Sequence, residues 1–248
     1  MSDNGPLRMR HEGARRRTLT VAEKRQLTPH YLSIHFKCDD FGGFVSTSPD
    51  DHIKLFLPQD GPSAGRPIMR DYTPRGFDPA DGTMILDFAL HHPAGPATAW
   101  AITAKIGDRI EIGGPRGSVL LPDDCDWYWL IGDETALPAI ARRIEEWPGK
   151  PIRALIAVTD ADEQLQLAGD DIHWLHRPSA LAHDPVALVE AVAALALPAG
   201  RGFIWIAAEA GVARALRDVV LDKGQPLARI KASGYWTQGV ADGHARLD

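Results

Sequence analysis

The first string of residues suited to chemistry is Arg70-Asp71-Tyr72-Thr73-Pro74-Arg75. It offers a cation for a pyrophosphate, an aromatic ring that can lie against the isoalloxazine of a flavin, and a hydroxyl that can bond a flavin nitrogen. On a strand, Arg70 and Tyr72 share one face and Thr73 points the other way, so a bend at Pro74 is needed to bring all three onto one ligand. The same residues are also consistent with a plain strand end followed by a turn.

The second string places a helix start after a pair of histidines. Gly95-Pro96 ends a predicted strand region, and residues 97–104 form the one predicted helix of this half of the chain. The free N–H groups and the positive dipole end of such a helix make a natural seat for a phosphate. His91-His92 has no partner histidine or carboxylate at helical spacing, so no metal site is predicted there. The same holds for His173 and His176, which lie in a predicted strand.

The third string, Gly132 to Ile140, links a predicted strand to a predicted helix. It does not follow the pattern G-x-G-x-x-G, so the ordinary dinucleotide fingerprint is absent. It still lies at the carboxyl end of a predicted parallel strand, where ligands bind in open α/β sheets. Thr135 suits the helix N-cap, and Pro138 falls in the first helical turn, where proline is tolerated. Asp133 and Thr135 can therefore either contact a cofactor directly or only cap the turn.

The elements that carry these strings change in character near residue 122. Before it, short β-rich runs separated by turn residues predict a small antiparallel barrel, with strands at 31–36, 53–57, 84–90 and 110–112. After it, strands and helices alternate, which predicts a parallel sheet covered on both faces. The predicted strands of this half lie at 127–131, 152–158, 172–176, 203–207 and 228–231, and the helices at 136–147, 185–197 and 212–222.

These patterns divide the chain into an Arg-rich tail at 1–17, a barrel at 18–122 and an α/β domain at 123–248. The tail has no periodicity, and we expect it to be mobile or loosely attached, with a basic arm for an acidic partner as the alternative. A barrel followed by a nucleotide-type α/β domain is the plan of flavin reductases.

Composition excludes several classes of protein. The 27 basic and 33 acidic residues give a net charge of −6, which argues against a dedicated nucleic-acid binder. Cys38 and Cys125 form no C-x-x-C pair, so a zinc ribbon, a dithiol redox motif and a four-thiolate iron–sulfur cluster are excluded. The longest apolar stretch, 186–198, contains Glu190 and is too short to span a bilayer, and no signal-peptide core is present. We therefore expect a cytoplasmic protein without membrane insertion.

Taken together, the ordered strings resemble the siderophore-interacting protein family, the FAD-containing ferric-siderophore reductases, from about Thr20 to Gly239. The nine residues from Gly132 to Ile140 are the strongest single match. The other matching strings are Leu27-Thr28-Pro29, Asp51-His52-Ile53-Lys54-Leu55, Arg70-Asp71-Tyr72-Thr73-Pro74-Arg75, Gly95-Pro96-Ala97 with Trp100-Ala101, Gly114-Pro115-Arg116-Gly117 and Gly234-Tyr235-Trp236. The resemblance implies an N-terminal antiparallel FAD-binding β-barrel followed by a ferredoxin-reductase-like nucleotide-binding α/β domain that receives NADH or NADPH.

The resemblance also implies roles for individual residues. Arg70 would face the flavin pyrophosphate, Tyr72 would lie along the isoalloxazine, and Thr73 would bond near its N5. The remaining cofactor-binding candidates are Asp87, Ala89 and His91 along the flavin, Gly95, Ala97 and Thr98 at the helix start, and Asp133 and Thr135 in the α/β domain. Lys54 and Arg116 occupy positions where basic residues attract the anionic ferric siderophore.

One departure from the family pattern concerns the substrate. The family often continues Gly-Tyr-Trp with a basic residue, whereas this chain has Thr237 and then Gln238. The loss of a cation makes a neutral or weakly anionic hydroxamate complex a better candidate than a polyanionic catecholate. Lys231 or Arg246 are the residues that could compensate.

The implied reaction is cofactor chemistry, with no catalytic acid, base or nucleophile and no metal ligands from the protein. Hydride would pass from nicotinamide to flavin, and single electrons from flavin to the Fe(III) of a siderophore. Asp160, Asp162 and Glu163 follow the second strand of the α/β domain, where they would repel a ribose 2′-phosphate, so NADH is favoured over NADPH. Arg142 and Arg143 on the preceding helix could offset this repulsion.

Two other functions stay open from the sequence. One is a flavin reductase that passes electrons to a separate redox protein, and the other is a non-enzymatic, flavin-free siderophore carrier. We expect the protein to be a monomer in each case.

Overall fold

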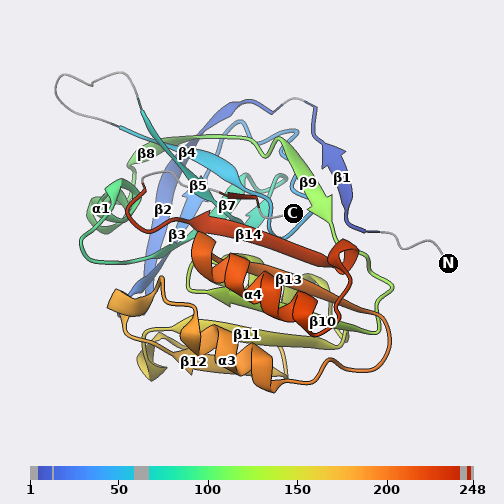
Figure 1. Ribbon diagram of the computed structural model, residues 1–248. Helices are drawn as coiled ribbons and strands as arrows, with labels where there is room; N and C mark the ends of the chain where they lie inside the picture. Colours follow the sequence, from blue (N-terminus) through green and yellow to red (C-terminus); the bar gives the residue numbers. More distant parts are fainter. Residues whose placement is uncertain (1–4, 13, 59–66, 241–244, 247–248) are drawn as a thin grey trace. The chain divides into compact units, whose positions relative to one another are not determined.

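The computed structural model describes residues 5–12, 14–58, 67–240 and 245–246 (Figure 1). The chain divides into two compact units. The N-terminal unit is Arg8–Val119, and the C-terminal unit is formed by the residues on either side of it. Cys38 and Cys125 are both buried free thiols, and burial raises the pKa of each.

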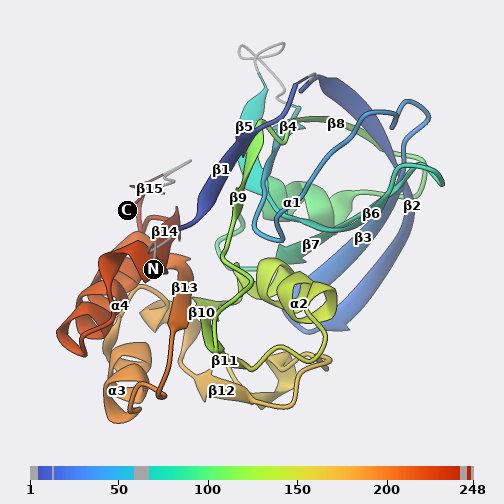
Figure 2. The ribbon, with the colours of Figure 1, turned by 90° about the vertical axis from the view of Figure 1, so that its right-hand side faces the viewer.

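The N-terminal unit is built on a curled antiparallel sheet of seven strands in the order β5-β4-β8-β2-β3-β7-β6 (Figure 2). The strands are β2 (Arg16–Thr28), β3 (Tyr31–Lys37), β4 (Ile53–Leu57), β5 (Ile68–Tyr72), β6 (Pro74–Asp78), β7 (Thr83–Ala89) and β8 (Arg109–Gly113). Alternate residues point inward, so that Ile53, Leu55 and Leu57 are fully buried on β4 while the residues between them are not. The predicted antiparallel, barrel-like architecture is confirmed.

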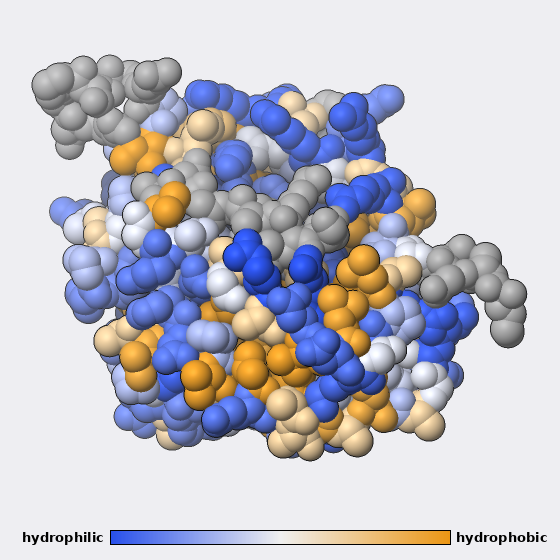
Figure 3. Space-filling model, in the orientation of Figure 1, coloured by the Kyte–Doolittle hydropathy of each residue, from blue (hydrophilic) through white to orange (hydrophobic). Residues whose placement is uncertain are grey.

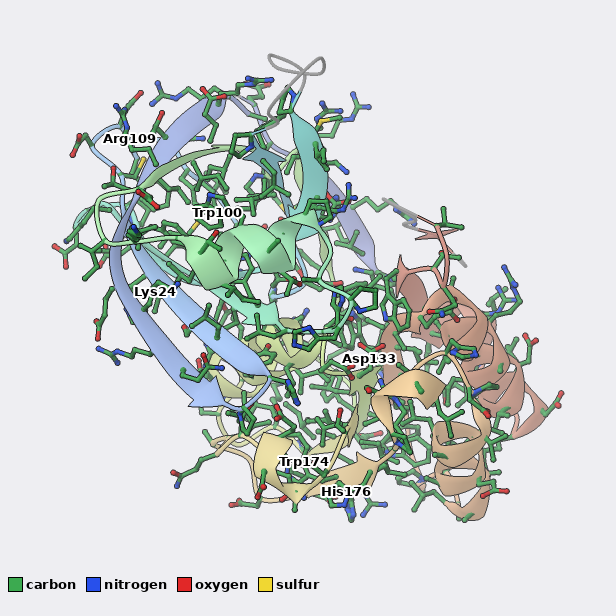
Figure 4. All side chains as sticks on the ribbon, turned by 90° about the vertical axis from the view of Figure 1, so that its left-hand side faces the viewer. Lys24, Trp100, Arg109, Asp133, Trp174 and His176 are labelled. Carbon is green, nitrogen blue, oxygen red and sulfur yellow. The ribbon has the colours of Figure 1, made fainter. Side chains whose placement is uncertain are left out.

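The helix of this unit, α1 (Pro96–Thr103), packs on β4 and β7. Its buried residues are Ala97, Thr98 and Ala101. Lys24 on β2 reaches the other end of the helix, where its Nζ donates to the carbonyl oxygens of Ile102 at 3.0 Å and Ala104 at 2.7 Å. A lysine at this position satisfies carbonyl groups that the helix leaves unpaired and opposes the negative end of its dipole (Figure 4).

Two strands of the N-terminal unit lie where the sequence predicts a loose tail. β1 (Leu7–Arg10) pairs with β9 (Gly117–Leu120) in a two-stranded sheet, and β2 already begins at Arg16. Arg17 is buried. The sequence predicts only a mobile or loosely attached tail here, because all four residues of β1 are exposed and leave no periodic pattern from which a strand could be predicted. The strand is fixed by backbone pairing to a partner far away in the sequence.

The C-terminal unit is an α/β sheet with strand order β12-β11-β10-β13-β14-β15. Its strands are β10 (Trp127–Asp133), β11 (Ile152–Val158), β12 (Ile172–His176), β13 (Gly202–Glu209), β14 (Ile230–Trp236) and β15 (Ala245–Arg246). All are parallel except β15, which pairs antiparallel with β14. The chain starts in the middle with β10, adds β11 and β12 on one side, and then returns to add β13 and β14 on the other.

Three helices cover the two faces of this sheet, as predicted. α2 (Leu137–Glu146) packs on β10 and β11, while α3 (Val186–Ala194) and α4 (Ala210–Asp222) pack together on the opposite face (Figures 1 and 2). Figure 3 shows apolar side chains in the part of the surface that α3 and α4 form. In the described part of the chain, every helix is too short or too polar to cross a lipid bilayer.

Candidate active site

The first string of the sequence lies where the two edges of the N-terminal sheet are joined. β5 ends at Tyr72 and β6 begins at Pro74, and these two strands are the opposite edges of the sheet. Thr73 alone connects them, and it is buried. The chain therefore changes its pairing partner from β4 to β7 within one residue. This change of direction corresponds to the bend at Pro74 that one shared ligand for Arg70, Tyr72 and Thr73 would need.

Tyr72 and Arg70 lie on the same face of β5, as strand geometry requires. The ring of Tyr72 packs on Phe88, with ring centroids 4.6 Å apart, and burial raises the pKa of its phenol well above the ordinary value. The phenol is therefore neutral and able to donate a hydrogen bond. Arg70 NH1 donates to the carbonyl of Met69 at 2.7 Å, and its other donors have no partner among the described residues. A guanidinium with spare donors is suited to a phosphate group.

Asp87 lies close to the same corner. Pro74 of β6 pairs with Leu86 of β7, and Thr73 and Asp87 are the chain neighbours of these two residues. The Asp87 carboxylate is buried, and its Oδ2 lies 3.9 Å from Nε of Arg75. Arg75, the last residue of the first string, thus opposes the negative charge of Asp87.

A second group of predicted residues meets at the start of α1. The N-cap residue is Gly95, and no side chain caps this helix end, so the first N–H groups of the helix are available to a ligand. Thr98 Oγ1 lies 3.4 Å from the carbonyl oxygen of Ala89 and 3.3 Å from Nε2 of His91. A Cβ at Gly95 would lie 3.4 Å from the His91 ring. The structure therefore brings Ala89, His91, Gly95 and Thr98 together beside the uncapped helix end.

The two predicted substrate cations differ in their surroundings. Lys54 Nζ forms an ion pair with Asp71 Oδ2 at 2.8 Å. Arg116 is exposed, and its guanidinium has no partner in the part of the chain that the structure describes. Tyr72 pairs with Ile53 and therefore lies on the same face as Ile53. Lys54 is the next residue of β4, so it lies on the opposite face of this strand pair from the Tyr72 ring.

In the C-terminal unit, the third string ends β10 at the point where the strand order reverses. Ligands bind at the carboxyl ends of the strands at such a reversal. A Cβ at Gly132 would lie 2.5 Å from the Cβ of Ala136 and 2.6 Å from the carbonyl oxygen of Ala207, so only glycine allows the turn to pack this closely on β13. The helix then begins at Leu137 with Ala136 as its N-cap, which has no side-chain hydrogen bond. The prediction that Thr135 is the N-cap is therefore wrong, whereas Pro138 does fall in the first turn.

Asp133 is almost completely buried, with 1% of its surface exposed (Figure 4). Its Oδ1 accepts from the backbone N–H of Thr135 at 2.9 Å and from the Thr135 hydroxyl at 2.5 Å. Its Oδ2 accepts from Nε1 of Trp236 at 2.9 Å and from the backbone N–H of Glu209 at 3.2 Å. Four protein donors occupy the two oxygens, so this geometry favours the role in which Asp133 orders the turn over direct contact with a cofactor.

The carboxyl ends of the neighbouring strands carry residues that the sequence reading missed. Glu209 ends β13 and caps α4, accepting at Oε2 from the N–H groups of Gly211 and Val212, while its Oε1 accepts from the N–H of Gln238 at 3.2 Å. Arg177 follows β12 and is buried. Arg177 comes directly after the predicted strand 172–176 and Glu209 two residues after the predicted strand 203–207, so the carboxyl-edge rule could have identified both.

Arg177 forms a partly buried ion pair with Glu134. Its NH2 donates to Glu134 Oε2 at 2.7 Å, while its buried NH1 has no hydrogen-bond partner among the described residues. Burial of the Glu134 carboxyl, together with the nearby charge of Asp133, raises its pKa to about 7 although Arg177 opposes the shift. This edge of the sheet thus holds a carboxyl group that changes charge near neutral pH and an arginine with spare donors.

The residues weighed for nicotinamide preference have other partners. Asp160 caps a short 3-10 turn by accepting from the N–H of Asp162, and Glu163 is buried. Arg142 is buried and pairs with Glu146, and the buried Arg143 stacks over the ring of Trp147 at 4.6 Å. Neither arginine is therefore available to offset the carboxylates after β11. Lys231 lies half-buried on β14, and the side chain of Arg246 lies outside the described residues.

Comparison with known proteins covers nearly the whole chain. Residues 125–239 match the family model described as siderophore-interacting protein, and residues 20–65 and 60–119 match the siderophore-interacting FAD-binding domain. The chain is 34% identical to the NADPH-dependent ferric-chelate reductase of Escherichia coli K12 over 254 residues, which covers 93% of this chain and 96% of that protein.

Solved structures agree with this result. A siderophore utilization protein from T. fusca superposes with a TM-score of 0.87 at 34% identity, covering 96% of this chain and 98% of that one. The ferredoxin reductase of carbazole 1,9a-dioxygenase superposes with a TM-score of 0.67 at 20% identity, covering 88% of this chain and 68% of that one. The second similarity shows the fold alone, and it confirms the predicted ferredoxin-reductase-like architecture.

Proposed function

Because this chain belongs to the siderophore-interacting protein family, we propose that it is a flavin-dependent oxidoreductase that takes hydride from NAD(P)H and reduces the Fe(III) of a ferric siderophore. The observation that carries this proposal is the end-to-end similarity to a ferric-chelate reductase, which covers both units of the chain. Reduction releases the metal because siderophore oxygens hold Fe(III) far more tightly than Fe(II).

The N-terminal unit fits FAD through two separate features. The spare guanidinium donors of Arg70 and the uncapped N-terminus of α1 both suit a pyrophosphate, which carries two negative charges that the protein must balance. Tyr72 offers an aromatic surface that packs on Phe88, and Thr73 and Asp87 are the chain neighbours of the paired residues Pro74 and Leu86. When bound, FAD accepts a hydride from the reduced nicotinamide and releases electrons one at a time to iron.

The remaining predicted residues shape the start of α1. Gly95 has no side chain, so the backbone stays open to a phosphate, and Ala97 is small and buried at the same turn. Thr98 and His91 interact at 3.3 Å, which orients the imidazole beside the helix end. Ala89 completes this group by accepting from Thr98. We assign all of these residues to cofactor binding, and none of them moves a proton in the reaction.

We place the nicotinamide nucleotide at the carboxyl edge of the C-terminal sheet, beside the turn that Asp133 and Thr135 order. Arg177 has a buried NH1 without a partner among the described residues, which suits an oxygen of the incoming nucleotide. Asp160 and Asp162 are exposed at the end of β11 and still favour NADH. The preference between NADH and NADPH therefore stays a prediction, to be read from the two KM values. We place the reaction in the cytoplasm, with the protein as a monomer.

The proposal is tested on the purified protein without oxygen. We expect a flavin absorbance spectrum, bleaching of that spectrum by NADH or NADPH, and its recovery when a ferric hydroxamate is added, with Fe(II) trapped by a coloured ferrous chelator. Colourless protein that binds no added FAD, or bleached protein that no ferric chelate reoxidises, would overturn the proposal. Reoxidation by a ferredoxin alone would favour electron transfer to a separate redox protein instead.

A matched pair of variants links the flavin to the predicted site. Arg70→Ala is expected to lose most of its bound FAD, since it removes the spare donors at the corner. Arg109→Ala is the control, because Arg109 is an exposed arginine on β8 of the same unit (Figure 4). Equal flavin content in the two variants would remove Arg70 from the site.

A further inference from the structure

Lys54 and Asp71 form a cross-strand ion pair on the β4–β5 strand pair. The register places Lys54 directly opposite Asp71, and Nζ lies 2.8 Å from Oδ2. The lysine side chain is 35% exposed and the aspartate side chain only 16% exposed. Because the two Cα positions are fixed by the sheet, the pair needs little ordering of the chain to form. A partly buried pair of this kind is also screened less by salt than a surface pair.

A second cation on this face, Arg16, is paired in the same way. Arg16 NH1 lies 2.9 Å from Oε2 of Glu111, and its guanidinium carbon lies 4.1 Å from the ring centre of Phe56. The registers of β2 and β4 with β8 bring these residues next to Lys54. Lys54 and Arg16 on the outer face of these strands are therefore each matched by a carboxylate, whereas Arg109, which shares this face of β8 with Glu111, is exposed.

Asp71 does more than neutralise Lys54. Its Oδ1 is buried and has no hydrogen-bond partner among the described residues. An unsatisfied carboxylate oxygen attracts donors and repels anionic oxygens. A ligand oxygen with a negative charge that approached Lys54 would therefore meet the opposing field of Asp71 at close range.

From this arrangement we propose that Asp71 is a specificity-determining residue that makes the reductase select ferric chelates of low negative charge. The inference rests on the proposed function and on the substrate-binding role that the family resemblance implies for Lys54. Specificity of this kind comes from a repulsive element built against one class of ligand, and here that element is Asp71.

The test compares two iron(III) complexes of opposite character, the trianionic tris(catecholate) and the neutral tris(acetohydroxamate). Asp71→Asn keeps the size of the side chain and removes its charge. In a dielectric close to that of water, the Coulomb repulsion between one negative charge and a trianion ~8 Å away corresponds to about a tenfold weaker binding of the trianion. We therefore expect the ratio of the two KM values, catecholate over hydroxamate, to fall about tenfold in the variant at low salt.

Two further variants show whether the effect passes through Lys54. Asp39→Asn makes the same change in net charge on the turn after β3, which the sheet order separates from β5 by three strands, and it is expected to leave the KM ratio unchanged. In the double variant with Asp71→Asn and Lys54→Met, we expect the KM ratio to return to the wild-type value. Asp71→Ser serves as a second neutral variant if the asparagine variant does not retain flavin.

The outcomes separate this inference from the proposed function. If the wild type reduces both chelates and Asp71→Asn changes the KM ratio no more than Asp39→Asn does, Asp71 has no role in specificity. A gain that persists after Lys54→Met would also overturn the inference. A wild type that reduces neither chelate would overturn the proposed function and the inference together.

Discussion

The hydrogen bonds of Asp133 allow the strongest prediction from this structure, because replacement with Asn changes one atom of a fully engaged group. The two carboxylate oxygens accept from four donors, two on Thr135 and one each on Glu209 and Trp236. In Asp133→Asn, one oxygen becomes an NH2 group that must face one of these donor pairs. A donor facing a donor in a buried site leaves both without a partner.

The two orientations of the Asn side chain set the expected cost. If its NH2 faces Trp236 and Glu209, both of those buried donors lose their acceptor. If it faces Thr135, the hydroxyl can rotate to accept, and only the backbone N–H of Thr135 is left unpaired. Each stranded buried donor costs about 1–3 kcal/mol, and a bond to a neutral amide is weaker than a bond to a carboxylate. We therefore expect the free energy of unfolding of the C-terminal unit to fall by about 2–4 kcal/mol.

Urea denaturation followed by tryptophan fluorescence measures this change. Trp236→Phe removes one donor without creating a new one, and it should cost about 1 kcal/mol. The double variant should lose less stability than the sum of the two single-variant losses, because it no longer contains an indole N–H without an acceptor. If Asp133→Asn unfolds within about 0.5 kcal/mol of the wild type, the four-donor geometry is wrong.

Three further predictions concern other parts of the two units. The pKa of Glu134 in the folded protein is about 7, above its ordinary 4.5, so the stability of the C-terminal unit should fall by about 2–3 kcal/mol as the pH rises from 4.5 through 7. Glu134→Gln can still accept from Arg177 but cannot ionise, so denaturation at several pH values should show a smaller decline. Lys24→Met keeps the aliphatic stem but removes the donors to the end of α1, which should lower the stability of the N-terminal unit by about 1–2 kcal/mol in urea. Gly132→Ala would place a Cβ 2.5 Å from that of Ala136, so we expect a loss of about 3 kcal/mol or more and a low yield of folded protein.

Each of these three predictions has a result that would contradict it. An unchanged pH dependence in Glu134→Gln would mean that the raised pKa belongs to another group. Lys24→Met with wild-type stability would show that water satisfies the end of α1 equally well. For Gly132→Ala the control is Gly42→Ala, because a Cβ at Gly42 meets no atom within 4 Å. Equal urea midpoints for these two variants would show that the turn has room for a side chain.

The sequence alone predicts an antiparallel barrel followed by a parallel α/β sheet, and it predicts a cofactor site of the flavin type. The alternation of strands and helices after residue 122 predicts the parallel sheet, because apolar strands need helices on both faces to be buried. The strings around Tyr72, Gly95 and Gly132 are each local, so the turn or helix start that they form depends on neighbouring residues. Local chemistry of this kind can be read without knowing the fold.

The tertiary structure decided which residues meet. The N-terminal arginines cannot be assigned to β1 from their own pattern, because the strand exists only through its pairing with β9. Asp71 is next to Tyr72 in the sequence, but its partner Lys54 lies 17 residues away and was fixed by the β4–β5 register. The donors to Asp133 from Glu209 and Trp236 lie 76 and 103 residues away. Sequence spacing carries no information on such pairs, because the order of strands in a sheet sets which charges and donors face each other.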